Sequence, residues 1–410
     1  MLSSTIGPAP MTQAPVIAAI DMGYGHLRPA AALANHLGIQ VLEMDRPPLG
    51  HARDRAFWNP VRNLYEPLTR LSQIPAIGLP IRPILNTITS IPPLWPSRDL
   101  SGPTQGTRWM RRAAKIGVGR TLAEHLRATS APLLSTFYAA PILAEIHGAE
   151  RLHCVVTDSD VNRVWAPPDS KETRITYYAP TDPARRRIAS YGVPLSRIRV
   201  TGFPLPGELV GRDRAALKRN FRARMERISR KGRPPLVVFA VGGAGAQVPL
   251  AKSVIRGLTR QILEGNLRLA MVAGRRDDVA SALRSVLAAQ DLTGHPGAEL
   301  LYESDVYAYF RRFNELLARA DVLWSKPSEL TFFAALGLPF IAAPPVGSHE
   351  MYNLRWATDR GAALPQHDPA VAGDWLLEWL EDGVLASAAE AGMCLPQMGL
   401  YDIVDQVQNA

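Results

Sequence analysis

Cysteine is scarce in this 410-residue sequence, which contains only Cys154 and Cys394. Two such distant cysteines provide neither a disulfide framework nor the spaced ligand pairs of a zinc site, and their scarcity fits a reducing compartment. Long apolar runs are also missing, because the least charged stretches, 133–146 and 331–346, are too short or too interrupted by proline to span a bilayer. Residues 1–15 have neither the basic nor the apolar region of a signal peptide. We therefore expect a cytoplasmic protein, either free or peripheral on the inner face of the plasma membrane.

Acidic residues are outnumbered, since 46 Lys and Arg face 37 Asp and Glu and leave a net charge of +9. The excess lies in two segments, because 212–233 carries +8 and 98–127 carries +5, which leaves the rest of the chain at −4. Neither segment alternates its cations with stacking aromatics, so we expect no nucleic-acid partner. Segment 98–127, which contains Trp109 and follows Trp95, is a candidate for binding an anionic membrane surface. Segment 212–233 is explained more simply as a solvated helix than as a lipid contact.

Strand-like apolar runs alternate with helical periodicity along the chain, which is typical of an α/β fold. Residues 16–44 predict a strand, an amphipathic helix and a second strand, which together form a βαβ unit. A stretch rich in Gly and Pro, 202–206, separates this series from a second α/β series. We predict a Rossmann-like domain over 1–205, another over 206–385, and a tail over 386–410 that returns to the first domain.

The first strand-to-helix turn carries Gly23, Tyr24, Gly25 and His26. Glycines at such a turn let a ligand approach the backbone, and the helix N-terminus that follows favours negative charge. Open α/β sheets bind ligands at the carboxyl ends of their strands, where His26 is expected. His26 is therefore either a general base for a hydroxyl nucleophile or a turn histidine that only caps the helix.

A second turn of the same kind, 242–246, contains Gly242, Gly243 and Gly245. It lacks the Lys-Ser/Thr of a nucleoside-triphosphate loop and the acidic partner of a dinucleotide fingerprint. Backbone N–H groups here could cradle a diphosphate, although a tight turn that only needs small residues would look the same.

Two further polar positions follow predicted strands. Asp158 ends one strand and could orient a base or bind a hydroxylated acceptor, but an Asx-turn explains it more simply. Arg275 follows another strand, where its guanidinium either binds a phosphate or is solvated together with Arg276.

The most specific stretch is 320–353, which reads as strand, polar turn, helix, strand and loop. Its polar side chains form two groups at neighbouring sheet ends, namely Ser325, Lys326 and Thr331, and then His349, Glu350 and Asn353. The first group suits a phosphate or a ribose, and the second suits sugar hydroxyls. Ordinary strand and helix punctuation explains the glycines and prolines of this stretch but not its many polar groups.

These residues resemble the GT-B glycosyltransferases, in particular the branch that contains the lipid-II N-acetylglucosaminyltransferase and the glycosyl-diacylglycerol synthases. Four segments match in order: Gly23 to His26 resembles an acceptor loop, 155–158 with Trp165 a "VTD…W" motif, 202–204 a "GxP" interdomain segment, and 325–353 a donor-site signature. The resemblance covers most of 15–365. It implies two Rossmann-like domains that face each other across a cleft.

The resemblance also implies an activity, the transfer of a sugar from a nucleotide diphosphate, most simply a UDP-sugar, to a hydroxyl acceptor. The acceptor could be lipid-linked, the transfer inverting, and neither metal nor cofactor is implied. His26 would be the base, assisted by Asp158, and Gly23, Tyr24 and Gly25 would border the acceptor. The donor would contact Gly242, Gly243, Gly245, Arg275, Ser325, Lys326, Glu329, Thr331, His349, Glu350 and Asn353.

One position departs from the family pattern. Three residues after Thr331 the family has a glutamate that holds the ribose hydroxyls, and here Ala334 stands there. Ser328 replaces a usual glycine, and Glu329 is the nearest carboxylate that could substitute. The departure keeps two other interpretations open: a nucleotide-sugar 2-epimerase of the same architecture, and a degenerate GT-B protein that only binds a ligand.

Overall fold

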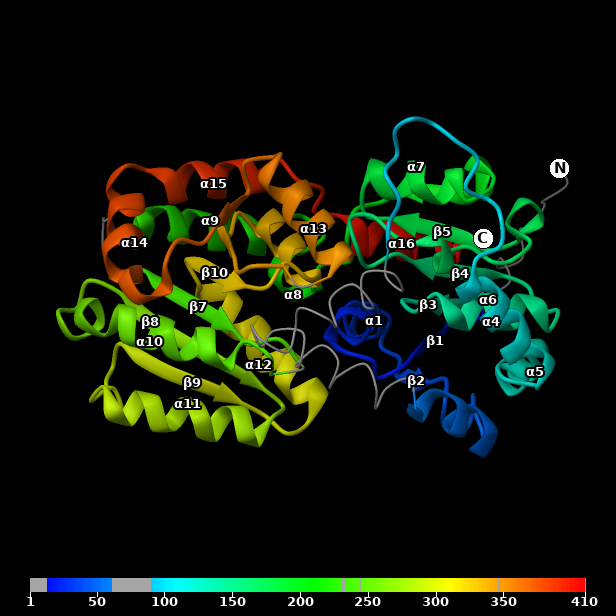
Figure 1. Cartoon of the computed structure of the whole chain (residues 1–410), viewed down its shortest axis with the longest axis horizontal. Coiled ribbons are helices and arrows are strands. Elements are labelled where there is room, and N and C mark those ends of the chain that lie inside the picture. The colour runs from blue at the N-terminus through cyan, green and yellow to red at the C-terminus, as the bar shows by residue number, and fades with distance from the viewer. Residues whose placement is uncertain (1–12, 61–89, 230–232, 244, 346, 410) are drawn as a thin grey trace, which may run out of the picture.

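The computed structural model describes residues 13–60, 90–229, 233–243, 245–345 and 347–409. These residues form two parallel six-stranded sheets, each covered by helices on both faces (Figure 1). The prediction of two Rossmann-like α/β units is therefore confirmed. Part of the basic segment 212–233, namely 230–232, lies outside the described residues.

The first sheet has the strand order β2-β1-β3-β4-β5-β6, and all its pairs are parallel. Its strands are β1 (Val16–Ala19), β2 (Val41–Glu43), β3 (Leu133–Ser135), β4 (Leu152–Val155), β5 (Thr176–Ala179) and β6 (Ile198–Val200). The helices between them are α1 (Tyr24–Leu37), α4 (Gln105–Lys115), α5 (Arg120–Thr129), α6 (Ala139–Ile146) and α7 (Asp182–Ser190). Their apolar faces pack on strands that are themselves apolar, as buried parallel sheets require.

The second sheet has the order β12-β11-β10-β7-β8-β9. Its strands are β7 (Leu236–Ala240), β8 (Arg268–Gly274), β9 (Ala298–Tyr302), β10 (Val322–Ser325), β11 (Phe340–Ala342) and β12 (Ala363–Pro365). Its helices are α8 (Gly207–Val210), α9 (Ala215–Ile228), α10 (Val248–Leu263), α11 (Asp277–Ala289), α12 (Val306–Arg319), α13 (Ser348–Thr358), α14 (Ala372–Glu381) and α15 (Val384–Met393).

Each sheet reverses its strand order beside its first strand, at β1–β3 in one and at β7–β10 in the other. In open α/β sheets the helices that leave such a switch point diverge, and a crevice forms at the carboxyl ends of the strands. In each sheet, the switch point therefore marks the edge at which a ligand is expected to bind.

Apolar contacts also join the two sheets into one continuous core on the side of α1. Phe203, at the crossing between the two units, stacks on Phe332 with ring centroids 4.7 Å apart. The last helix, α16 (Gly399–Gln408), lies beside the first domain (red in Figure 1) and packs Tyr401 edge-on against His36 of α1. Within the described residues no helix has both the length and the apolar character needed to cross a membrane.

Candidate functional site

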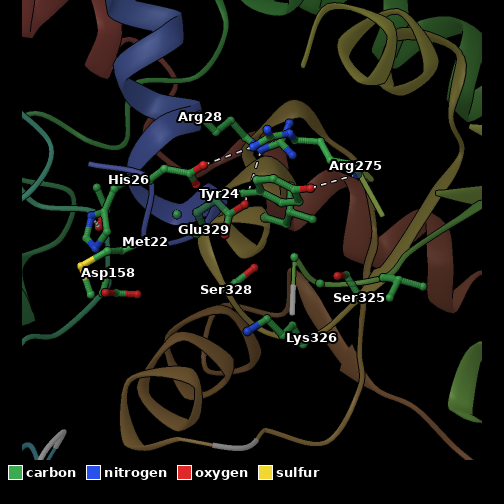
Figure 2. Close-up of a pocket in the computed structure, with 18 of the residues that line it drawn as sticks. Met22, Tyr24, His26, Arg28, Asp158, Arg275, Ser325, Lys326, Ser328 and Glu329 are labelled. Atoms are coloured by element: carbon green, nitrogen blue, oxygen red, sulfur yellow. Dashed lines mark hydrogen bonds and ion pairs between the residues drawn. The ribbon is translucent and has the colours of Figure 1, made fainter. Parts of the chain in front are cut away.

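A cavity of about 360 Å³ opens between the carboxyl ends of the two sheets. Its first-domain wall comes from the turn after β1 and the loop after β4, and its second-domain wall from the turns after β7, β8 and β10 (Figure 2). Twelve sequence-predicted residues line it: Gly23, Tyr24, Gly25, His26, Asp158, Gly242, Gly243, Arg275, Ser325, Lys326, Glu329 and His349. The structure therefore gathers side chains from both halves of the chain into one space.

Four predicted residues do not line this cavity. Gly245 lies in the turn after β7 with φ 72°, and Thr331 is fully buried. Glu350 and Asn353 are also buried, on the first turns of α13 directly behind the cavity wall. Glu350 and Asn353 contact residues of the wall, namely Lys326 and Asp158.

His26 is held in one orientation by the strand next to its own. Its Nδ1 lies 2.7 Å from the carbonyl oxygen of Thr136, while the Thr136 hydroxyl donates to the His26 carbonyl at 2.7 Å. Because a carbonyl only accepts, the Nδ1 carries the proton, and Nε2 of the neutral ring is an acceptor. Burial lowers the pKa of His26 below its ordinary value of 6.5, against the opposing effect of Asp158. The ring is therefore neutral at pH 7, as a general base must be.

Asp158 is fixed across the interface between the domains. Asn353 of α13 donates to its Oδ1 at 2.9 Å and accepts the N–H of Ser159 at 2.8 Å. Next in the same loop, Asp160 forms a buried bidentate pair with Arg187 of α7, with both distances 2.9 Å. Such pairs add geometric specificity. The loop after β4 therefore presents Asp158 beside His26 with little freedom (left in Figure 2).

Tyr24 extends from α1 into the second domain and fills the space between two of its turns. A Cβ on Gly243 would lie 3.3 Å from the Tyr24 ring, and a Cβ on Gly274 would lie 2.8 Å from its hydroxyl. That hydroxyl accepts the backbone N–H of Arg275 at 3.1 Å. Part of the reason for glycine in these turns is therefore an aromatic ring from the other domain.

The cations of the second-domain wall are already paired with carboxylates. Lys326 lies 2.6 Å from Glu350, and Arg275 lies 3.2 Å from Asp21 of the first domain. The Gly242 N–H donates to the side-chain oxygen of Gln247 at 3.2 Å, a neutral acceptor that a phosphate oxygen could replace. Positive side chains in the described lining number four and carboxylates three, namely Arg28, Arg275, Arg276 and Lys326 against Asp21, Asp158 and Glu329. The cavity thus carries a small positive excess.

Arg28 is the largest omission of the sequence-based prediction. It lies on α1 with only 2% of its surface exposed, and it reaches Glu329 at 3.4 Å and the Tyr309 hydroxyl at 3.3 Å (Figure 2). Its spacing of four from Tyr24 puts both residues on one helix face, which is the only local signal that could have indicated it.

The position that departs from the family pattern, Ala334, does not face the cavity. It is fully buried in a 3-10 helix, η4 (Glu329–Leu336), and its carbonyl oxygen packs so closely on Gly392 of α15 that a Cβ there would clash with it. Ser328 and Glu329, by contrast, line the cavity where η4 begins. The carboxylate available to a ligand is therefore at position 329.

Comparison with known proteins identifies relatives of the kind that the motifs resemble. A family model described as a domain of unknown function, DUF6938, matches residues 193–296. A processive diacylglycerol beta-glucosyltransferase of Bacillus licheniformis is 23% identical over 219 residues, 51% of this chain and 49% of the relative. The UDP-N-acetylglucosamine--N-acetylmuramyl-(pentapeptide) pyrophosphoryl-undecaprenol N-acetylglucosamine transferase of Paraburkholderia phymatum is 26% identical over 225 residues, 55% and 57% of the two chains. The chain thus matches about half the length of these curated relatives.

Solved structures confirm the architecture. MurG of Acinetobacter baumannii superposes with a TM-score of 0.54 at 15% identity, over 97% of this chain and 100% of MurG. MnaA of S. aureus, solved with UDP, gives 0.54 at 11% identity over 97% and 96% of the two chains. The UDP-GlcNAc 2-epimerase of Neisseria meningitidis, bound to UDP-GlcNAc, gives 0.51 at 12% identity over 97% and 99%. The fold is GT-B, and the resemblance to the glycosyltransferase branch is confirmed.

Proposed function

We propose that this protein is a glycosyltransferase that moves a sugar from a nucleotide diphosphate to a hydroxyl acceptor. One observation carries the proposal: a neutral histidine with an acceptor nitrogen shares a cavity with a glycine-rich turn of the opposite domain and with the cations of two neighbouring turns, Arg275 and Lys326. A base beside a site for a diphosphate leaving group is the minimum that sugar transfer to a hydroxyl requires. The relatives named above are glycosyltransferases, which supports the same reaction class.

In the proposed reaction Nε2 of His26 takes the proton of the acceptor hydroxyl. The hydroxyl oxygen then bonds to the anomeric carbon as the bond from that carbon to the diphosphate oxygen breaks, which inverts the configuration. Asp158 stabilises the imidazolium that forms, as a carboxylate beside a general base does. The negative charge that develops on the diphosphate is met by Lys326, Arg275 and the N–H groups of Gly242 and Gly243.

The donor is proposed to be a UDP-sugar, since neighbours of the same fold were solved with UDP or UDP-GlcNAc. Ser325 and His349 line the second-domain wall, and we propose that they contact the sugar and its phosphates. Glu350 and Asn353 contact this wall from behind, through Lys326 and Asp158 respectively. We propose that the reaction needs neither a metal nor a cofactor, because Lys326 and Arg275 of the chain itself would offset the charge of the diphosphate.

A panel of nucleoside diphosphates in a thermal-shift assay, followed by transfer assays with radiolabelled UDP-sugars, tests the proposal. Stabilisation by UDP together with transfer to a lipid or carbohydrate hydroxyl, unaffected by EDTA, is the expected result. Interconversion of the free UDP-sugar without transfer would identify an epimerase instead. Binding without any turnover would identify a ligand-binding protein, and no stabilisation by any nucleotide would contradict nucleotide-sugar binding.

The acceptor side is proposed to face an anionic membrane. Helix α4 carries Arg108, Arg112 and Lys115, and Trp109 on the same helix is 37% exposed. Trp95 nearby in sequence is 76% exposed. Exposed indoles and cations together suit the headgroup level of a bilayer.

Co-sedimentation with liposomes of phosphatidylglycerol and phosphatidylcholine tests this surface. Binding should fall steeply between low and high salt, because about 1 kcal/mol per surface cation is electrostatic and therefore screened. Trp95→Ser should weaken binding, whereas Leu263→Ser, which alters a 51% exposed apolar residue of the second domain, should not. Binding that ignores both salt and Trp95 would exclude this surface.

A further inference from the structure

The guanidinium of Arg28 is enclosed by aromatic rings of the second domain. It lies 4.6 Å from the ring centroid of Phe310, 4.7 Å from that of Phe313 and 5.5 Å from that of Tyr309. Such rings attract a cation, but they replace few of the hydrogen bonds that water would give it. In the described part of the chain, Nη1 has no hydrogen-bond partner. An arginine on α1 is thus buried at the cost of incomplete hydrogen bonding.

Stability gives no reason to retain this arginine. Buried ion pairs are often no more stabilising than apolar residues of equal size. The pair with Glu329 is also a poor one by geometry, with a single contact of 3.4 Å between Nε and Oε1. A role in positioning Glu329 explains the arrangement better than a role in folding.

Glu329 has its second carboxylate oxygen on the side of the cavity. It is the first residue of η4, and its Oε2 would lie 3.7 Å from a Cβ on Gly25, in the turn that carries His26. Both Gly25 and Glu329 line the cavity. A glycine at 25 therefore leaves open the space directly in front of a carboxylate oxygen.

We propose that Arg28 is a positioning residue that holds the Glu329 carboxylate toward the cavity, where Oε2 accepts hydrogen bonds from a vicinal diol of the bound nucleotide sugar. This inference rests on the proposed function. A lone carboxylate would repel the diphosphate of the same ligand, whereas the guanidinium of Arg28, in the cavity wall beside Glu329, offsets that charge. The diol could belong to the ribose or to the transferred sugar.

The pair also joins the two domains. Arg28 belongs to the first domain and Glu329 to the second, 301 residues later. The Glu329 carboxylate is therefore neutralised and oriented by a residue of the opposite domain, on the same helix as His26.

Calorimetric titration of the full chain with matched ligands tests the inference. The affinity of UDP compared with that of 2′,3′-dideoxy-UDP measures recognition of the ribose diol. The affinity of UDP-glucose compared with that of UDP-3-deoxyglucose, which has neither the 2,3-diol nor the 3,4-diol, measures recognition of the sugar diol. For one of the two pairs, the wild type should lose about tenfold or more in affinity when the hydroxyls are absent, as when a hydrogen bond to a charged group is lost.

Three variants and one control separate positioning from folding. The affinity ratio compared here is the affinity for the ligand with the diol divided by the affinity for the matched ligand without it. Arg28→Met and Glu329→Gln should each bring this ratio close to one. The double variant Arg28→Met/Glu329→Gln removes both charges, so it should recover the melting temperature lost in Arg28→Met without recovering the ratio. Arg28→Lys keeps the charge and should restore part of the ratio. Arg212→Met, which removes a 61% exposed arginine paired with Asp405, should keep the full ratio.

The possible failures are distinguishable. Wild type that binds UDP but shows a ratio near one for both ligand pairs would overturn this inference and leave the proposed function intact. The same holds if the double variant keeps the full ratio. If the wild type binds no nucleotide at all, the proposed function fails, and this inference fails with it.

Discussion

The first strand-to-helix turn of each domain differs between the two domains. We call the turn from β1 to α1 the first corner and the turn from β7 to α10 the second corner. In the first, the chain leaves β1 through 20–23 and enters α1; in the second, it leaves β7 through a turn that includes Gly242, Gly243 and Gly245 and enters α10. Both corners lie at a switch point of strand order and border one cavity. The first corner fills that cavity with side chains, and the second borders it with glycines.

Helical geometry explains why the first corner can supply both the proposed base and the contacts between the domains. Tyr24 and Arg28 are four residues apart, share one face of α1 and point into the second domain. His26 lies between them in sequence and points the other way, toward Thr136. One turn of helix thus supplies both the proposed base and the contacts that join the domains, while the second corner leaves room for a ligand's phosphates.

Replacement of His26 should give the largest effect on turnover, because it removes the proposed general base of the first corner and leaves the proposed diphosphate site of the second corner intact. His26→Ala is expected to lower kcat about 10²- to 10⁴-fold, the usual contribution of a general base. UDP affinity, which the second corner provides, should change little in calorimetry. His125→Ala, on α5 and away from the cavity, is the matched control. Unchanged kcat would remove His26 from the mechanism.

Acid should reproduce this loss reversibly. Burial lowers the pKa of His26 below its ordinary value of 6.5, so the base is largely unprotonated, and kcat/KM nearly level, between pH 8 and pH 7. Below the pKa of His26, kcat/KM should fall about tenfold per pH unit as the ring is protonated. The unfolded chain binds this proton more readily, so stability also falls with pH below 6.5, and melting temperatures must accompany each rate. If kcat/KM already declines above pH 7, the acidic decline of the pH profile belongs to a group other than His26.

Replacement of Lys326 tests the second corner. Lys326→Met removes a cation at the position proposed for the diphosphate, and kcat/KM for the donor should fall about tenfold, with KM raised, as for one lost charge-assisted hydrogen bond. Lys218→Met, which removes an exposed lysine of α9, should leave both constants unchanged. A lower kcat with constant KM would mean that Lys326 acts only on the charge that develops in the transition state.

Both corners were predictable from sequence, because each depends on a pattern of residues that are close together in the chain. Apolar strand, glycine turn and amphipathic helix identify both, and the position of His26 follows from the first. Local patterns fail where glycine conformation decides: the pattern of residues 111–127 is helical throughout, but Gly117 and Gly119, with φ 90° and 78°, separate α4 from α5.

The contacts between the corners were not predictable. A buried arginine needs a partner, and the partner of Arg28 lies 301 residues away, so no window of sequence contains both. The sequence shows that Ala334 stands where the family has a glutamate, but it does not show which carboxylate faces the cavity instead. Helix η4 is a 3-10 helix with three residues per turn, so the spacing that applies to an α-helix does not tell which of its residues face the cavity.

Tyr24 is where the two corners meet, and its hydroxyl should give the smallest measurable effect. Burial raises the pKa of Tyr24, so the hydroxyl stays protonated while it accepts the N–H of Arg275. Tyr24→Phe keeps the ring between Gly243 and Gly274 and removes only this bond, about 1 kcal/mol of unfolding free energy. KM for the donor should rise a few-fold because the turn after β8 loses its anchor, and kcat should hold. Tyr307→Phe, with 42% of its side chain exposed, controls for loss of a hydroxyl. If Tyr24→Phe changes neither the urea denaturation curve nor KM, the turn after β8 keeps its shape without the hydrogen bond from Arg275 to Tyr24.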